Sequence, residues 1–237
     1  MAICPQHGDS IAMKLSFYTL TRAWIGAIAL TLAACSSAPP APNWQVDAKG
    51  AMDRAVAAYL EGNTRVEQAE RTQARQQIAR TGRADLIAQA ELLHCAARVA
   101  SLVWEPCTGF ETLRPDATPS QRAYADYLRG QVAASDIPLL PELQRTAALR
   151  APNDGSALPS AAEPLSILVA SGVLLQTGKA SPAVIEQAVN VASSQGWRRP
   201  LLAWLGVQVQ RAKQAGQTTE AERLLRRVDL VQGTASR

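Results

Sequence analysis

The residues best suited to chemistry gather in the middle of this chain of 237 residues. Of its four cysteines and two histidines, His94, Cys95 and Cys107 lie close together in sequence. Adjacent residues of a helix point about 100° apart, so His94 and Cys95 do not face each other as a nucleophile and its base would. One histidine and two cysteines also provide too few ligands for a zinc site. We therefore expect no metal and no cofactor.

Three glutamates flank the same segment, namely Glu91, Glu105 and Glu111. Pairs of carboxylates are the catalytic groups of most glycoside hydrolases, so a cell-wall hydrolase is one interpretation. However, the sequence has no nucleophile-elbow, phosphate-loop or His-Glu-x-x-His motif, and glutamates on helices mostly face solvent. We predict that no residue of the chain is catalytic and that the protein is not an enzyme.

The composition excludes two broad classes of protein. Apolar residues make up 47% of the chain and charged residues 19%, which is typical of a folded globular protein and not of a disordered one. The net charge of +4 is too small to indicate a nucleic-acid-binding protein. Aromatic residues make up only 5%, while alanine is abundant, which favours closely packed helices over sheets.

The N-terminus has the pattern of a secretory signal peptide. The basic residues Lys14 and Arg22 precede an uncharged, mostly apolar run at 23–34 that ends in small residues. This run is too short to remain in a bilayer as a membrane-spanning helix. We therefore expect residues 1–34 to be removed as the chain is exported.

The end of that run, Leu32-Ala33-Ala34-Cys35, resembles the lipobox of bacterial lipoproteins. The resemblance implies that cleavage falls before Cys35 and that Cys35 is acylated on its sulfur and its new amino group. Ser36 stands where an Asp would retain such a protein in the inner membrane, so the resemblance implies anchoring in the outer membrane, facing the periplasm. Several acyl chains, at about 0.8 kcal/mol per buried CH₂, make a firm anchor without a membrane-spanning helix.

An exported chain enters an oxidising compartment, which affects whether the thiols of Cys95 and Cys107 remain reduced. An even pair of cysteines there favours a disulfide bond. Pro106 allows the chain to turn back from the end of the preceding helix, so the two residues can meet. The alternative is a pair of buried, reduced thiols.

The rest of the chain predicts an all-α protein of about nine helices in antiparallel pairs, without a sheet. Glycine and proline separate segments with helical periodicity, and capping boxes are expected at Thr118 with Gln121 and at Thr219 with Glu222. The expected helices are 44–61, 65–81, 84–103, a helix opening at 118–121, 141–150, 164–178, 182–195, 200–215 and one from 219 onward.

Two of these helices have informative surfaces. The helix at 84–103 is apolar except for one narrow stripe of Glu91, His94, Arg98 and Ser101, which we expect to face solvent in an otherwise central helix. The helix at 164–178 has no charged residue and is too short to span a bilayer, so we expect it to be buried. The helix at 65–81 and its flank are basic, and we expect a solvated face there, formed by Arg65, Arg71, Arg75, Arg80 and Arg83.

The C-terminal helix pair resembles the tetratricopeptide repeat. Gly216, Ala221, Leu225 and Val228 fall where that family has its turn glycine and the small, large and small residues of its second helix. The resemblance implies a short α-solenoid of stacked helix pairs with a concave face. A plain antiparallel helical array is the alternative.

The sequence thus predicts a series of segments along the chain. They are a signal peptide at 1–34, the lipidated Cys35 with a Pro-rich tether at 35–43, a helical region at 44–150, a loop at 151–163, helical hairpins at 164–232 and a tail at 233–237. We also expect the natural start of the chain to be Met13, so that residues 1–12 come from a start codon assigned too early.

The functional prediction is a non-catalytic helical module, anchored to the outer membrane, that binds another periplasmic or outer-membrane protein and no nucleic acid. Trp197, Leu201 and Trp204 are either core residues or the anchors of that interface. One alternative is an enzyme that acts on peptidoglycan, or the activator of such an enzyme. Another is a carrier of a hydrophobic ligand, based on the charge-free segment at 164–178.

Overall fold

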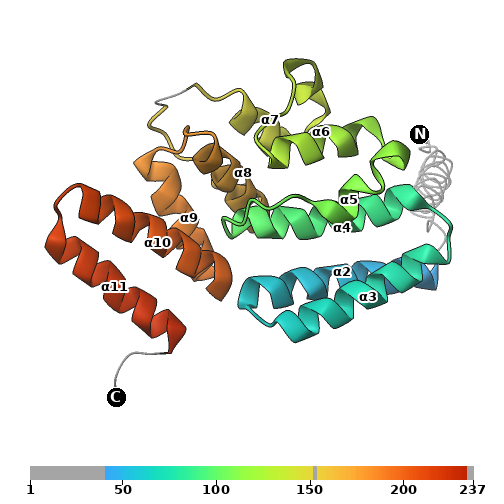
Figure 1. The fold of residues 1–237 in the computed structure, drawn as a ribbon, viewed down its shortest axis with the longest axis horizontal. Helices are drawn as coiled ribbons and strands as arrows, with labels where there is room; N and C mark the ends of the chain where they lie inside the picture. Colours follow the sequence, from blue (N-terminus) through green and yellow to red (C-terminus); the bar gives the residue numbers. More distant parts are fainter. Residues whose placement is uncertain (1–40, 152–153, 234–237) are drawn as a thin grey trace, which may run out of the picture. The chain divides into compact units, whose positions relative to one another are not determined.

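All regular structure in the computed structural model is helical (Figure 1), over the residues that it describes, 41–151 and 154–233. These residues form ten α-helices and two 3₁₀-helices and no strand, so the all-α prediction is confirmed. The predicted signal peptide, the lipidation site at Cys35 and the residues from 234 onward lie outside the described residues. The described residues from Asn43 onward form one compact unit.

The helices follow one another with short connections, except for the loop before α8. Their bounds are α2 (Asn43–Glu61), α3 (Thr64–Ala79), α4 (Ala84–Ala100), α5 (Thr108–Glu111), η1 (Arg114–Asp116), α6 (Pro119–Leu128), η2 (Ala134–Leu139), α7 (Glu142–Ala148), α8 (Pro164–Gln176), α9 (Pro182–Ser194), α10 (Arg198–Gln214) and α11 (Thr218–Gln232).

Helices α2 and α3 form an antiparallel hairpin that packs against α4 (Figure 1). The turn has Gly62 in the left-handed region, and the side chain of Asn63 then caps α3 by accepting a hydrogen bond from the Val66 amide. The buried face of α2 repeats alanine at steps of three and four, at Ala48, Ala51, Ala55 and Ala58. Small residues at this spacing let the neighbouring helix backbones approach closely.

Helix α4 is the centre of the fold, since α2, α3, α5, α6 and α8 all contact it. Its closest neighbour is α8. A Cβ atom added at Gly172 would lie 2.4 Å from the carbonyl oxygen of Val99, so the two helices touch through backbone at this point. One residue further along α4, the carbonyl of Ala100 accepts a hydrogen bond of 3.0 Å from the indole of Trp204 in α10.

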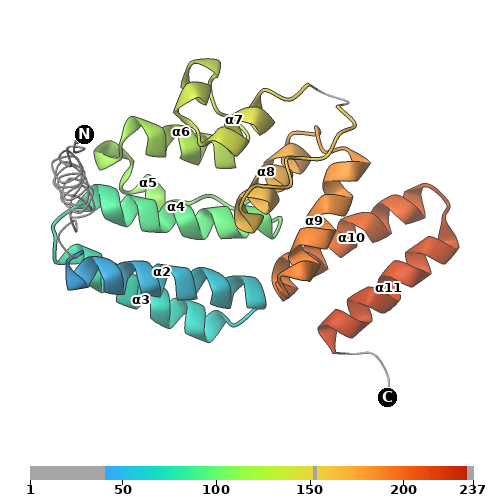
Figure 2. The same ribbon diagram turned by 180° about the vertical axis from the view of Figure 1, so that it is seen from behind.

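Helix α8 confirms the prediction of a buried helix, because its residues from 167 to 174 are all buried. Figure 2 shows it beyond the C-terminal end of α4, with α9, α10 and α11 following in turn. The main apolar cluster includes residues of α4, α6, α8, α9 and α10, so it continues across the loop at 151–163. None of the described helices is long and apolar enough to cross a membrane.

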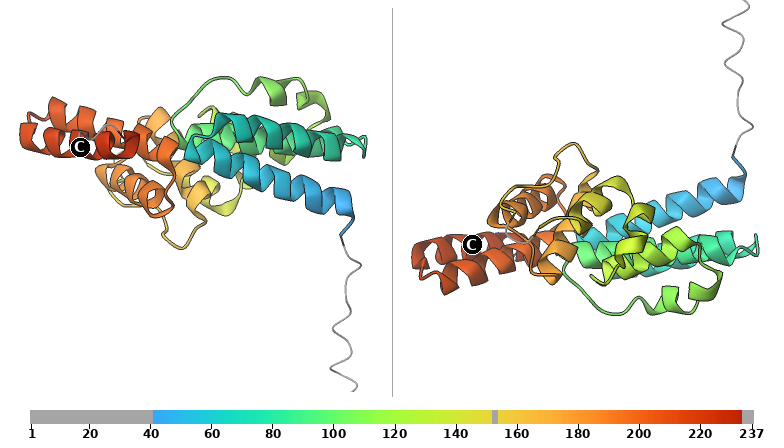
Figure 3. Two further views of the ribbon diagram at one scale, coloured as in Figure 1. Left: turned by 90° about the horizontal axis from the view of Figure 1, so that it is seen from below. Right: turned by 90° about the horizontal axis from the view of Figure 1, so that it is seen from above.

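The C-terminal helices α10 and α11 lie side by side (Figure 3). One predicted feature here is wrong. Helix α11 begins at Thr218 after Gln217, so Thr219 lies inside its first turn and forms no capping box. The other predicted capping box is confirmed, since Thr118 and Gln121 bond each other's backbone amides at the start of α6.

The contact between α8 and α4 makes Gly172 a test of the fold. Gly172→Ala should lower the free energy of unfolding by about 1–3 kcal/mol, because the new methyl group would overlap the Val99 carbonyl. The matched control is Gly206→Ala in α10, where nothing lies within 4 Å. That change should raise stability by about 0.5–1 kcal/mol through helix propensity. Urea unfolding of both variants checks this, and equal effects would contradict the close packing.

Candidate functional site

Cys95 and Cys107 form a disulfide bond, as predicted, with their Cα atoms 5.9 Å apart. Cys95 lies in α4 and Cys107 immediately precedes α5, so the bond holds the intervening loop against α4. An ion pair between Arg98 and Glu105 holds the same loop. The bond uses both thiols, so neither cysteine can act as a nucleophile while it is intact.

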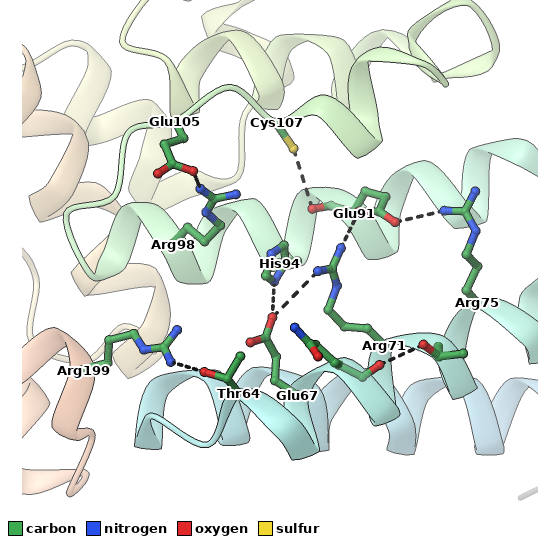
Figure 4. A network of polar contacts seen from close by, with 12 residues as sticks. Thr64, Glu67, Arg71, Arg75, Glu91, His94, Arg98, Glu105, Cys107 and Arg199 are labelled. Carbon is green, nitrogen blue, oxygen red and sulfur yellow. Dashed lines mark hydrogen bonds and ion pairs between the residues drawn. The ribbon is translucent and has the colours of Figure 1, made fainter.

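The polar stripe of α4 was predicted to face solvent, and this prediction is wrong (Figure 4). Glu91 and His94 face α3, with the side chain of His94 only 14% exposed. Arg98 instead pairs with Glu105, and Ser101 is buried and bonds the Ala97 carbonyl. Two arginines of α3, Arg71 and Arg75, reach across to this stripe, so the basic helix does not present only a solvated face. The sequence pattern was ambiguous because two helices with complementary charges can bury a polar seam between them.

The seam is built from short, oppositely charged contacts. The Glu91 carboxylate receives one hydrogen bond from Arg71 and one from Arg75, each 3.0 Å long. Arg71 also lies 3.8 Å from the Glu67 carboxylate, whose Oε1 is 3.4 Å from Nδ1 of His94. Figure 4 shows these side chains meeting between α3 and α4.

Aromatic contacts extend the seam to α10. The ring of Tyr59 in α2 packs edge-on against His94, with 5.6 Å between ring centroids. The guanidinium of Arg199 at the start of α10 lies 4.0 Å from the centre of the Tyr59 ring, a cation–π contact. Side chains of four helices therefore meet around His94, and their role is to hold these helices together.

The three candidate catalytic glutamates are not brought together as an acid–base pair. Glu91 lines a small cavity of about 30 Å³, enough for one or two water molecules, while Glu105 lines a different hollow beside the disulfide. Glu111 is hydrogen-bonded by Arg114, which lowers the pKa of its carboxyl group. A general acid needs the opposite shift.

The predicted interface residues are mostly core. Trp204 is completely buried and Leu201 is 8% exposed, so neither can anchor a partner. Trp197 is partly buried and packs against the apolar clusters of α2, α4 and α10. The sequence left open whether these residues belong to the core or to an interface, and their burial favours the core.

A hollow that holds several charged side chains and is separate from this seam is a groove of about 550 Å³ between α9, α10 and α11. Three arginines line it, Arg211 on α10 and Arg223 and Arg227 on α11. Its other polar residues are Glu186, Asn190, Gln208, Gln217 and Glu220, and its apolar residues include Ile185, Val189, Ala212 and Leu224. We refer to it below as the α9–α11 groove.

Sequence reasoning missed the α9–α11 groove, although one signal was present. The segment 198–233 contains seven basic and three acidic residues, whereas 43–197 contains fourteen basic and sixteen acidic ones. This asymmetry marks the last two helices as a basic surface. The sequence does not identify the arginines that line the groove, because this depends on how α11 packs on α10.

The chain matches no family model, and no curated protein or solved structure is significantly similar to it. The described residues also contain no cluster of three or more His, Cys, Asp or Glu side chains that could hold a metal ion. The candidate site is therefore defined by its geometry alone.

The buried His94 makes stability depend on pH. Burial, with the charges of Arg71, Arg98 and Arg199, lowers the pKa of His94 to about 4. In the unfolded chain the pKa of histidine is about 6.5, so between these values the unfolded state binds more protons. This site should therefore destabilise the fold progressively as the pH falls from about 6.5 to 4.

The measurement is urea unfolding of the wild type and of His94→Gln across this pH range. As the pH falls, the unfolding free energy of the wild type should decrease more than that of the variant, because glutamine does not titrate. Carboxyl groups are present in both proteins, so most of their contribution cancels in the difference. A pH-independent difference would contradict the depressed pKa.

Proposed function

We propose that this protein is a periplasmic lipoprotein of the outer membrane that binds another protein through the α9–α11 groove and catalyses no reaction. The observation that carries the proposal is the groove itself, a hollow walled by three helices and lined by charged and amide side chains. Helical walls hold such side chains in fixed positions, which limits the entropy lost when a partner binds.

The residues of the α9–α11 groove favour binding over catalysis. No serine, threonine, cysteine, histidine, lysine or tyrosine lines it, so apart from its two glutamates it contains none of the usual nucleophiles. Of its two carboxylates, Glu220 is hydrogen-bonded by Arg223, which lowers its pKa and keeps it ionised. It is therefore not poised as a general acid.

The hydrophobic-carrier alternative has little support from α8. The absence of charge in this helix is explained by its contacts with α4, α7 and α9, which bury its residues in the core. A role as activator of a peptidoglycan enzyme is a special case of protein binding, and the partner would then be that enzyme.

The anchor is tested at Cys35. Cys35→Ser should abolish labelling of the protein with radioactive palmitate and should move it out of the outer-membrane fraction. The control is Ser36→Asp, which keeps the lipid but should retain the protein in the inner membrane. Palmitate labelling and membrane fractionation measure both, and an acylated Cys35→Ser protein would contradict the proposal.

Binding is tested by placing a photo-crosslinking amino acid at one of two glutamines of α10. Gln208 lines the α9–α11 groove, whereas Gln210 is exposed on the same helix and does not. Irradiation of intact cells should give a defined crosslinked product from position 208 and little from position 210. Equal products, or none at 208, would contradict binding in the groove.

A further inference from the structure

We propose that the α9–α11 groove recognises an extended, acidic segment of its partner protein. This inference rests on the proposed function, because it gives the chemistry of the segment that the groove would hold.

The basic charge of the described chain is concentrated in the helix pair α10–α11, which contributes all three arginines of the groove. The excess of four basic residues in 198–233 contrasts with an excess of two acidic residues in 43–197. An acidic partner is therefore attracted to the α10–α11 hairpin and not to the rest of the described chain. Such complementarity raises the association rate and orients the partner before contact.

The three arginines of the α9–α11 groove differ in what they already contact. Arg223 makes two hydrogen bonds with Glu220, 2.6 and 2.7 Å long, so its guanidinium is already engaged. In the part of the chain that the structure describes, no carboxylate lies within 4 Å of the guanidinium of Arg211 or Arg227. These two arginines are open to a carboxylate from a partner, which a guanidinium can bind through two parallel hydrogen bonds.

The spacing of the arginines on α11 adds to this argument. Arg223 and Arg227 lie four residues apart and therefore on the same face of the helix. Like charges at this spacing repel each other. Glu220 is bonded to Arg223, and its charge also interacts with Arg227. A carboxylate bound at Arg227 would reduce the repulsion further.

The remaining side chains suit the backbone of a peptide. Asn190, Gln208 and Gln217 each offer an amide donor and an amide acceptor, which match the N–H and C=O groups of an extended chain. Ile185, Val189 and Leu224 supply apolar surface for its side chains. No aromatic residue lines the groove, so it lacks the stacking surfaces that single-stranded nucleic acids use.

The same helices provide matched control residues. Lys213 lies two positions after Arg211, and Arg226 is the neighbour of Arg227, yet neither lines the α9–α11 groove. Replacing any of these four residues by alanine removes one positive charge. A difference between the pairs therefore reports position in the groove and not net charge.

The test uses the full mature protein and a fluorescein-labelled peptide of alternating Glu and Ala, with binding followed by fluorescence anisotropy. Arg211→Ala and Arg227→Ala should each weaken binding about tenfold, which corresponds to about 1.4 kcal/mol. Lys213→Ala and Arg226→Ala should weaken it less than about twofold, because neither side chain lines the groove and an ion pair made in solvent is worth little. A peptide of alternating Lys and Ala should not bind.

Circular dichroism melting of each variant establishes that it is folded. Equal effects at the groove and control positions would overturn the inference, as would binding of the Lys-Ala peptide. Arginine-dependent binding of peptidoglycan fragments without binding of the Glu-Ala peptide would overturn it as well, because the ligand would then be a cell-wall polymer.

The crosslink at Gln208 separates this inference from the proposed function. Peptide mapping of the crosslinked product identifies the partner segment that lies in the groove. An acidic segment whose capture is lost in Arg211→Ala supports both proposals. A neutral or basic segment overturns the inference and leaves the proposed function standing, whereas the absence of any adduct overturns both.

Discussion

The fold depends on the last turn of α4, where two other helices attach directly to its backbone. Gly172 of α8 touches the carbonyl oxygen of Val99, and the indole of Trp204 in α10 donates a hydrogen bond to the carbonyl of Ala100. A residue larger than glycine would push α8 away from α4. The Trp204 bond satisfies a carbonyl near the helix end, and burying that group without a partner would cost about 1–3 kcal/mol.

A second attachment lies along the length of α4. Glu91 is held by two arginines of α3 and is covered on its other side by Gly109 of α5, where a Cβ atom would fall 2.4 Å from its carboxylate. His94 continues the contact through Tyr59 to Arg199 of α10. Ion pairs of this partly buried kind add little net stability, because the desolvation of the charges offsets much of the attraction.

Local sequence signals predicted the helices well because glycine, proline and caps act within a few residues. The capping box at Thr118, the buried α8 and the disulfide are of this kind, whereas the short helices α5, η1 and η2 have too few residues to show a period. The orientation of the α4 stripe could not be predicted, because it depends on the arginines that α3 brings to it. The α9–α11 groove likewise depends on three helices packed together, and only its basic charge was visible in the sequence.

Helix α10 connects the core of the fold to the α9–α11 groove, because its two halves have different neighbours. In its first half, Arg199 contacts Tyr59 of α2, Leu201 packs in the main apolar cluster and Trp204 is hydrogen-bonded to α4. Its second half carries Gln208 and Arg211, which line the α9–α11 groove. Helix α11 forms the other wall and buries only Ala221 and Leu224, so it is the less firmly held of the two. Elements with few buried apolar contacts open at the lowest free-energy cost, so the groove combines one rigid wall with one adaptable wall. The proposed acidic segment would therefore meet Arg211 on a firmly held helix and Arg227 on a helix that can adjust to it.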